Sequence, residues 1–360
     1  MLVIFLSSAI SRADYFPLIQ KNQPFPADLM LIYQGGFHRP QWTVNRYAPY
    51  VTYRDAQGGN EQWLYDGFLI IEFQNGRGYT YEQYSNLKHA QKQQWVTLLE
   101  RNFALNDGVP NLEKTVDAAI ARIGPPLRRR QVYLTLPVPM PGQTNWGDLD
   151  GRSLDFNKKE DRLAACEWYM DAALKKWQNL APKQLDLAGF YWVAEQYPGT
   201  NDFFPDIAQQ VHTRGKQFIW IPSFHVNRPL GDWKSFGFDE ACLQPNYFFH
   251  PDLSPSRLQI ACDYARNHGM GLEMEFDFRV ITNSAVYEPR LHAYLDAFVK
   301  NGVQDDAAMG WYEGGGALYK LAVSDNSQMR ADYDEVAQFV LKRQHAVDEK
   351  FKEGQAQAVK

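Results

Sequence analysis

The chain alternates short apolar segments with longer amphipathic ones. Eight runs are rich in β-branched and aromatic residues, as buried strands are. These predicted strands cover residues 28–36, 67–74, 131–139, 185–195, 217–224, 240–249, 271–278 and 309–316. Between them, apolar residues recur at helical spacing. The predicted helices cover residues 84–103, 112–124, 160–180, 202–214, 254–269 and 289–302. The helix over 254–269 is expected to have Ser254 as its N-cap and Pro255 at its first position.

Strands that alternate with helices pair in parallel through right-handed crossovers. A count of eight favours closure into a (β/α)8 barrel, which needs ~250 residues and accepts long βα loop insertions. An open doubly wound sheet is the alternative, but QGGFHRP (34–40) is not the Gly-rich phosphate turn of that fold. We therefore expect one α/β barrel over 28–350, an N-terminal extension over 1–27 and a tail over 351–360.

Charge and cysteine content exclude several function classes. The net charge of -5 and the pI near 5.9 give no electrostatic reason to bind nucleic acid or an anionic membrane. The three cysteines, Cys166, Cys242 and Cys262, are far apart and form no CxxC pattern. We therefore expect neither a disulfide framework nor a cysteine-rich metal site, and no cofactor.

The N-terminal segment MLVIFLSSAISRADY (1–15) carries a short apolar run that ends in small residues. It resembles the hydrophobic region of a signal peptide but lacks the preceding basic residues. Export to the periplasm or cell surface is expected if it is a signal, and a cytoplasmic location if it is not. The run is too short to span a membrane.

The segment GLEMEFDF (271–278) places three carboxylates on one face of a predicted strand. Because strand side chains alternate between faces, Glu273, Glu275 and Asp277 share one side and the apolar residues share the other. Like charges that repel in this way raise one another's pKa, so that one group holds a proton near neutral pH. This arrangement suits an enzyme that needs both an acid and a charged carboxylate.

In a (β/α)8 barrel, catalytic groups project from the carboxyl ends of the strands. Acidic and aromatic residues dominate those ends here, without a GxSxG, HExxH or clustered metal-ligand motif. Paired carboxylates suit glycosidic bond cleavage. We expect Glu195, after the fourth strand, to be the acid/base and Glu275, on the seventh, to be the nucleophile, with Glu273 as the alternative nucleophile. This placement resembles that of many retaining barrel glycosidases.

Other polar and aromatic residues near the strand ends are candidates for substrate binding. They are His38, Arg39, Glu72, Trp192, His225, Asn246, Tyr247, Glu273, Asp277, Tyr312 and Glu313. Each has a structural interpretation too: the acids could pair with arginines, and the rings could belong to the core.

Four segments taken in order carry a family resemblance: WLYDGFLIIEF (63–73), LAGFYWVAE (187–195), CLQPNYFF (242–249) and GLEMEFDF (271–278). Together they resemble the bacterial domain of unknown function 4855, of Bacteroides-type bacteria, over about residues 28–340. The resemblance implies a fold similar to that of barrel glycosidases and export in organisms that degrade complex glycans. It implies no particular substrate.

Two functions therefore stay open. The first is a glycoside hydrolase that cleaves a glycosidic bond of an oligosaccharide or polysaccharide with a carboxylate pair. The second is a glycan-binding barrel without catalysis, in which acids pair with bases and rings bind sugar. The sugar, the linkage, the anomeric outcome, the exo or endo mode and the oligomeric state do not follow from the sequence.

Overall fold

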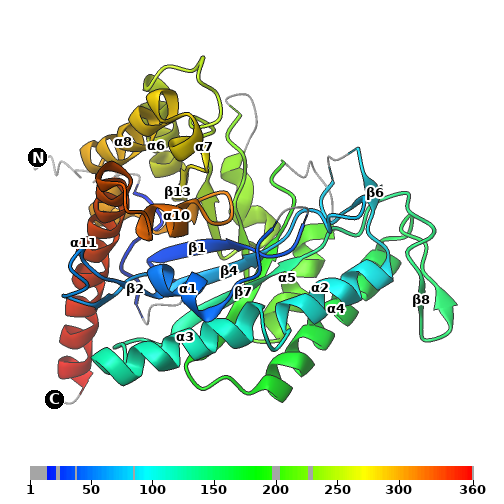
Figure 1. The fold of residues 1–360 in the computed structure, drawn as a ribbon. Helices are drawn as coiled ribbons and strands as arrows, with labels where there is room; N and C mark the ends of the chain where they lie inside the picture. Colours follow the sequence, from blue (N-terminus) through cyan, green and yellow to red (C-terminus); the bar gives the residue numbers. More distant parts are fainter. Residues whose placement is uncertain are drawn as a thin grey trace, which may run out of the picture.

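Eight parallel strands close into a barrel in the order β1-β14-β13-β12-β11-β10-β7-β4 (Figure 1). This computed structural model describes residues 14–21, 25–36, 39–83, 86–196, 203–225 and 230–358. The barrel strands are β1 (Asp28–Tyr33), β4 (Gly67–Ile71), β7 (Arg130–Leu136), β10 (Leu185–Trp192), β11 (Gln217–Trp220), β12 (Glu240–Leu243), β13 (Gly271–Glu275) and β14 (Met309–Tyr312). Each predicted run overlaps one of them, so the predicted (β/α)8 barrel is confirmed.

The register of the strands decides which side chains face the barrel interior. Glu273 of β13 pairs with Gly310 of β14, and Glu275 pairs with Tyr312. Because side chains alternate along a strand, these four residues share the inner face, and Met274 faces the surrounding helices. The two glutamates therefore project into the barrel, as the alternation in the sequence predicted.

The helices that follow the strands form the outer layer (Figure 1). They include α2 (Lys92–Asn102), α3 (Gly108–Ile123), α4 (Lys159–Leu180), α5 (Phe203–Thr213), α6 (Ser256–His268) and α8 (Ser284–Lys300). Further helical elements were not predicted: α1 (Val44–Val51), the 3-10 helix η1 (Leu230–Phe236), α7 (Arg279–Thr282), α9 (Val303–Asp306), α10 (Ala317–Ala322) and α11 (Ser327–Ala358). Residues 351–358 continue α11 rather than forming a separate segment.

Four predicted helix starts are wrong. Two were predicted too late in the chain: α3 begins at Gly108 rather than at residue 112, and α8 begins at Ser284 rather than at residue 289. The other two were predicted too early. The helix predicted over 84–103 begins at Lys92, because residues 88–89 pair as a short strand with residues 79–80 and the Gln91 side chain forms a capping box with Gln94. The helix predicted from Ser254 begins at Ser256, with Pro255 in the cap position.

Three two-stranded sheets lie in loops at the carboxyl ends of the barrel strands and beside α1. They comprise β2 (Thr52–Tyr53) with β3 (Gln62–Trp63), β5 (Tyr79–Thr80) with β6 (Lys88–His89), and β8 (Asp148–Leu149) with β9 (Arg152–Ser153). In Figure 1, β6 and β8 lie at the opposite end of the barrel from α11. The barrel thus has an elaborated carboxyl end and an amino end covered by the long C-terminal helix.

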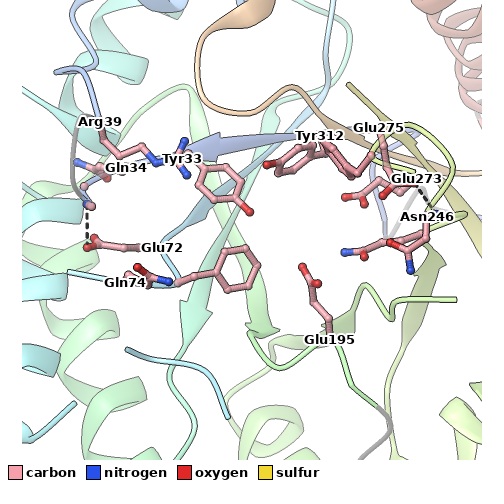
Figure 2. A pocket seen from close by; sticks show the side chains of 15 residues that line it. Tyr33, Gln34, Arg39, Glu72, Gln74, Glu195, Asn246, Glu273, Glu275 and Tyr312 are labelled. Atoms are coloured by element: carbon pink, nitrogen blue, oxygen red, sulfur yellow. Dashed lines mark hydrogen bonds between the residues drawn. The ribbon is translucent and has the colours of Figure 1, made fainter. Parts of the chain in front are cut away.

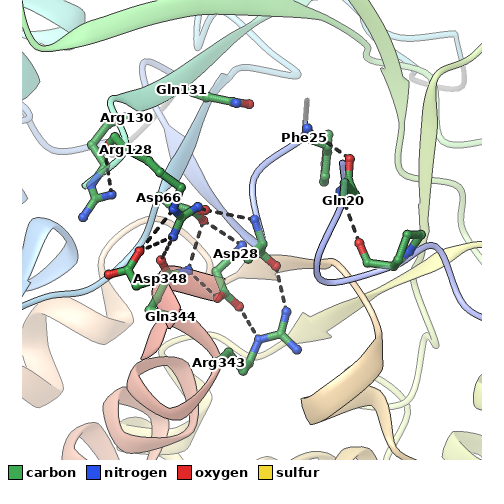
Figure 3. A network of polar contacts seen from close by, with 12 residues as sticks. Gln20, Phe25, Asp28, Asp66, Arg128, Arg130, Gln131, Arg343, Gln344 and Asp348 are labelled. Atoms are coloured by element: carbon green, nitrogen blue, oxygen red, sulfur yellow. Dashed lines mark hydrogen bonds and ion pairs between the residues drawn. The ribbon is translucent and has the colours of Figure 1, made fainter. Parts of the chain in front are cut away.

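A buried polar network fastens α11 to the amino ends of β1 and β4 (Figure 3). Arg343 donates to Asp28 at 2.6 Å, and Gln344 donates to Asp28 at 2.7 Å and to Asp66 at 3.1 Å. Arg128 pairs with Asp66 from the other side. Because each buried charge has an opposite charge or a hydrogen-bond partner, the network fixes the helix without leaving an unpaired ion.

The described part of the N-terminal extension also closes the amino end of the barrel. The Phe16 amide donates to the Met270 carbonyl at 3.1 Å, and the Phe25 ring packs 5.7 Å from that of Tyr133 inside the barrel. The proposed signal segment falls mostly on residues 1–13, outside the described residues. Within the described residues, no helix combines the length and apolarity needed to cross a membrane.

Candidate active site

A cavity of about 390 Å³ opens at the carboxyl ends of the barrel strands (Figure 2). This volume falls in the range of small-molecule pockets, roughly 300–1,000 Å³. The lining residues come from both halves of the barrel: Tyr33, Gln34, Gly35, Gly36, Arg39, Glu72, Phe73, Gln74, Glu195, Gln244, Asn246, Phe249, Glu273, Glu275 and Tyr312. We refer to this cavity as the barrel pocket.

Glu195 enters the barrel pocket three residues beyond the end of β10. Desolvation by the surrounding protein raises the pKa of its carboxyl to about 8, and repulsion from Glu82 and Glu275 acts in the same direction. A hydrogen bond from Gln244 opposes the rise but does not cancel it. A carboxyl with this pKa is mostly protonated at neutral pH, which is the state a general acid needs.

Glu275 ends β13 and lies among hydrogen-bond donors. Its Oε2 accepts from the Asn246 amide at 2.7 Å and from the Tyr294 hydroxyl. The Asn246 backbone has a left-handed φ of 55°, a conformation that asparagine tolerates better than most residues, and this turn aims its N–H at the carboxylate. Burial raises the pKa of Glu275 to about 7, while these donors and Arg257 hold it below where burial alone would place it.

Glu273 lies two residues before Glu275 on β13, deeper in the barrel, and has a different environment. It is 1% exposed, and its Oε1 has no hydrogen-bond partner among the described residues. Burial, followed by repulsion from Glu275 and Glu195, raises the pKa of Glu273 well above its ordinary value. Burial and repulsion therefore favour the protonated form of Glu273, and the ionised carboxylate on this strand is better stabilised at Glu275.

Glu72 forms an ion pair at the opposite end of the pocket. Arg101 Nη1 lies 2.5 Å from Glu72 Oε2, and the Gly36 amide donates to Oε1 at 3.2 Å. Burial nevertheless raises the pKa of Glu72 to about 7, outweighing the effect of Arg101. Gly35 has a φ of +88° and passes so close to this pair that any Cβ would clash with it. This loop therefore requires glycine, both for its backbone conformation and for space.

Four aromatic rings form a continuous wall along the barrel pocket. The Tyr33 ring centroid lies 5.6 Å from that of Phe73 and 5.3 Å from that of Tyr312, which in turn lies 5.6 Å from that of Phe249. All four rings line the cavity. Aromatic faces beside polar side chains can pack against the C–H faces of sugar rings while hydroxyl groups reach the polar partners.

The structure brings seven of the predicted site residues into one pocket: Arg39, Glu72, Glu195, Asn246, Glu273, Glu275 and Tyr312. In Figure 2, Glu195, Glu273, Glu275 and Asn246 gather at one end, and Arg39 and Glu72 lie at the other. The carboxylates predicted on the fourth and seventh barrel strands therefore open onto the same space.

Five other predicted residues lie elsewhere. Trp192 is 4% exposed and packs on the aromatic rings of α5, and Tyr247 lies beneath the Arg290 guanidinium at 3.6 Å. Asp277 pairs with Arg279 at 2.9 Å. Glu313 accepts hydrogen bonds from two amides at the start of α10 and from the buried Tyr50 hydroxyl. His225 lies outside the pocket lining, and its Nε2 is 3.4 Å from the Ser223 hydroxyl. The predicted binding residue His38 lies outside the described residues.

Eight residues of the pocket lining were missing from the predicted site: Tyr33, Gln34, Gly35, Gly36, Phe73, Gln74, Gln244 and Phe249. Their signal in the sequence was strand parity. Tyr33, two residues beyond inward-facing Leu31, and Phe73, two beyond Ile71, continue the inner faces of β1 and β4. The same parity that places Glu273 and Glu275 inside the barrel therefore identifies Tyr33 and Phe73 as inward-facing rings.

One side-chain group with metal-ligand chemistry lies away from the pocket, between α8 and α11. His292 Nε2 lies 3.8 Å from Glu288 and 3.7 Å from Asp332, and its Nδ1 lies 2.8 Å from Glu335. Both ring nitrogens of His292 already have carboxylate neighbours, so these contacts are accounted for without a metal ion. The geometry therefore assigns no metal, and the group takes no part in the pocket.

A closed parallel barrel with acidic and aromatic side chains at the carboxyl ends of its strands defines a (β/α)8, or TIM-barrel, protein. The chain belongs to the family described as Domain of unknown function (DUF4855), which matches residues 28–338. The family resemblance seen in the sequence is thus confirmed.

Two further comparisons say little about function. No curated protein matches the chain. Among solved structures, it is similar to a D-psicose 3-epimerase crystallised in the presence of D-fructose, with 12% sequence identity and a TM-score of 0.35 over 87% of this chain and 99% of the other. Similarity at this level bears on neither the substrate nor the reaction.

Proposed function

We propose that this protein is a glycoside hydrolase in which Glu195 is the acid/base and Glu275 is the nucleophile of a retaining mechanism. The observation that carries the proposal is the meeting of these two carboxyls, from the fourth and seventh barrel strands, in one pocket beside an aromatic wall. Cleavage of a glycosidic bond requires a protonated acid at the leaving oxygen and an ionised partner at the anomeric carbon.

The two environments suit the two roles. Glu195, protonated by virtue of its raised pKa, would give its proton to the leaving oxygen as the C–O bond breaks. Glu275, whose anionic form is stabilised by donors from Asn246 and Tyr294, would form the covalent bond to the anomeric carbon. Ionised Glu195 would then remove a proton from water, which attacks the same carbon and releases Glu275. Each proton and electron pair is returned at the end of the cycle.

Hydrolysis of a panel of plant and host glycans by the purified protein tests the proposal. Glu195→Gln should lower kcat/KM by roughly 10²- to 10⁴-fold, the usual contribution of a general acid or base, and Glu275→Gln by at least as much. Both variants should still bind the glycan. Glu100→Gln, an exposed change of the same kind on α2, is the matched control and should leave hydrolysis unchanged.

Azide separates the two roles. It should restore turnover to Glu195→Ala and give a glycosyl azide of retained configuration, whereas with Glu275→Ala it should give the inverted azide. Hydrolysis that is the same in the parent, Glu195→Gln and Glu275→Gln contradicts the assignment. Glycan binding by the parent with no hydrolysis across the panel favours the alternative, a glycan-binding barrel whose affinity comes from the aromatic wall. Export also remains a proposal, because it depends on the N-terminal segment.

A further inference from the structure

Arg39 gives the barrel pocket a positively charged end. It is the only basic side chain among the described residues that line the pocket. Figure 2 shows it with Gln34 and Gln74 at the end opposite Glu195, Glu273 and Glu275. A ligand that reaches from one end to the other would therefore meet the acids with one part and Arg39 with another.

The guanidinium of Arg39 is held in place without a carboxylate partner. Its Nη1 donates to the Gly314 carbonyl at 2.7 Å, and its Cζ lies 4.2 Å from the centroid of the Tyr33 ring. Across the described residues, no carboxylate lies within ion-pair distance of Arg39. By contrast, Arg101 and Arg279 nearby are each paired with an acid.

The nearest acid in the same end of the pocket is already engaged. Glu72 accepts from Arg101 and from the Gly36 amide, so that both of its oxygens have donors. Arg39 lowers the pKa of Glu72 through space but forms no hydrogen bond with it. Among the described residues, Arg39 uses one of the five N–H groups of its guanidinium for a hydrogen bond to the Gly314 carbonyl, so this pocket-lining cation can donate others to a ligand.

We propose that Arg39 binds a substrate carboxylate, and hence that the glycan recognised by this pocket contains a uronic acid residue. The planar guanidinium matches the two oxygens of a carboxylate in a bidentate arrangement, which a neutral hydroxyl cannot offer. A uronic acid also presents a sugar ring to the aromatic wall that flanks Arg39. Cleavage of a glycan that contains a uronic acid rests on the proposed function. Binding of the uronic acid by Arg39 does not.

An anionic ligand can enter because the acids of the pocket are only partly ionised near pH 7. Burial raises the pKa of Glu72 and Glu275 to about 7 and that of Glu195 to about 8, and it raises that of Glu273 well above its ordinary value. Repulsion of the incoming carboxylate is therefore weaker than four ionised glutamates would produce.

Binding of methyl glycosides, measured by ligand-observed NMR and calorimetry, tests the inference without any need for turnover. The ligands are methyl glucuronide and methyl galacturonide, their neutral partners methyl glucoside and methyl galactoside, and methyl galactoside 6-sulfate. The parent should bind a uronide about 10- to 100-fold more tightly than its neutral partner, as expected for a hydrogen-bonded charge pair.

Arg39→Met should abolish this preference while changing affinity for the neutral glycosides by less than about 3-fold, because only a charge-assisted contact is lost. Arg39→Lys should retain part of the preference. Arg129→Met removes the same charge from a half-exposed position away from the pocket and should behave as the parent.

Absence of uronide binding by the parent, or uronide binding that Arg39→Met retains, overturns the inference. An Arg39-dependent preference for the sulfate over the uronides overturns the assignment of a carboxylate. These outcomes are separate from failure of the proposed function. Hydrolysis of neutral glycans that needs Glu275 but not Arg39 would support the proposed function and contradict the role of Arg39. Arg39-dependent uronide binding without hydrolysis would support the role of Arg39 and contradict the proposed function.

Discussion

Removal of the Tyr294 hydroxyl, which donates to the pocket acid Glu275, should shift the pH dependence of hydrolysis in a definite direction. Tyr294 donates its hydroxyl hydrogen to Glu275 Oε2, while the Tyr247 amide donates to the Tyr294 oxygen at 3.4 Å. The second contact leaves the Tyr294 hydrogen directed at the carboxylate. In the change Tyr294→Phe, the anion of Glu275 loses a donor, so the pKa of Glu275 must rise above its present value of about 7.

The size of the effect follows from the strength of the bond. A hydrogen bond to a charged group contributes roughly 1.5–3 kcal/mol, and each pH unit corresponds to about 1.36 kcal/mol. In the parent, kcat/KM should rise as Glu275 ionises near pH 7 and fall as Glu195 loses its proton near pH 8. In Tyr294→Phe, the acidic limb should move upward by about one to two pH units, and kcat/KM at pH 6 should fall by about 10- to 100-fold.

The assay is a pH profile of kcat/KM on a glycan found by the hydrolysis screen. Tyr333→Phe is the control, since this buried tyrosine donates to the Pro49 carbonyl at 3.0 Å, outside the pocket lining. Its profile should overlay that of the parent after correction for folded protein. An acidic limb that stays in place in Tyr294→Phe refutes the reasoning, because Glu275 would then not be the group whose ionisation limits the rate.

Three further predictions concern the pocket acids, the loop beside them and the amino end of the barrel. Glu273→Gln resembles the protonated acid, so it should retain kcat/KM within about 10-fold at pH 7, well short of the loss expected for a catalytic carboxylate; a complete loss in steady-state assays would make Glu273 the nucleophile. Gly35→Ala should lower glycan affinity, measured by calorimetry, and thermal stability more than Gly215→Ala does. Both glycines have a positive φ, but only at Gly35 would the added Cβ lie within 3 Å of the Glu72–Arg101 ion pair. Equal losses would mean that backbone strain alone is responsible. Arg343→Met should lower the free energy of unfolding in urea by about 3–5 kcal/mol because it leaves Asp28 buried and unpaired, and Asp28→Asn in the same chain should recover part of the loss; an unchanged urea midpoint for Arg343→Met contradicts this account.

Strand positions could be predicted from the sequence because a barrel strand is buried on both faces. Its composition is then continuously apolar, and the run itself marks the element. Helix starts depend on local competition instead. Residues 88–89 form a strand pair with residues 79–80, a contact between segments that helical periodicity cannot reveal. The long helix α11 was missed because its polar face carries Arg343 and Gln344 into a buried network rather than into solvent.

Residues of the candidate site could be predicted from the sequence where strand parity applies. The prediction failed where parity was not considered. Glu195 has the parity of inward-facing Tyr191, and so it reaches the pocket, whereas Trp192 has the opposite parity and packs under α5. Glu313 follows inward-facing Tyr312 and is directed away from the pocket for the same reason. Asp277 shares the parity of Glu275 but comes after the end of β13, where the chain turns and Arg279 captures the carboxylate.

Three neighbouring acids are compatible with a stable barrel because their hydrogen bonds are unequal. If all three were ionised, repulsion in a poorly hydrated pocket would be severe. Glu275 has donors on its Oε2, and Glu195 has one from Gln244. Within the part of the chain that the structure describes, Glu273 Oε1 has no hydrogen-bond partner. A negative charge should therefore be favoured on Glu275, and protonation should be favoured on its two neighbours. It follows that the division of roles between acid and nucleophile depends on donors supplied by residues outside strand seven, and that exchanging these donors, rather than the acids, is the way to alter it.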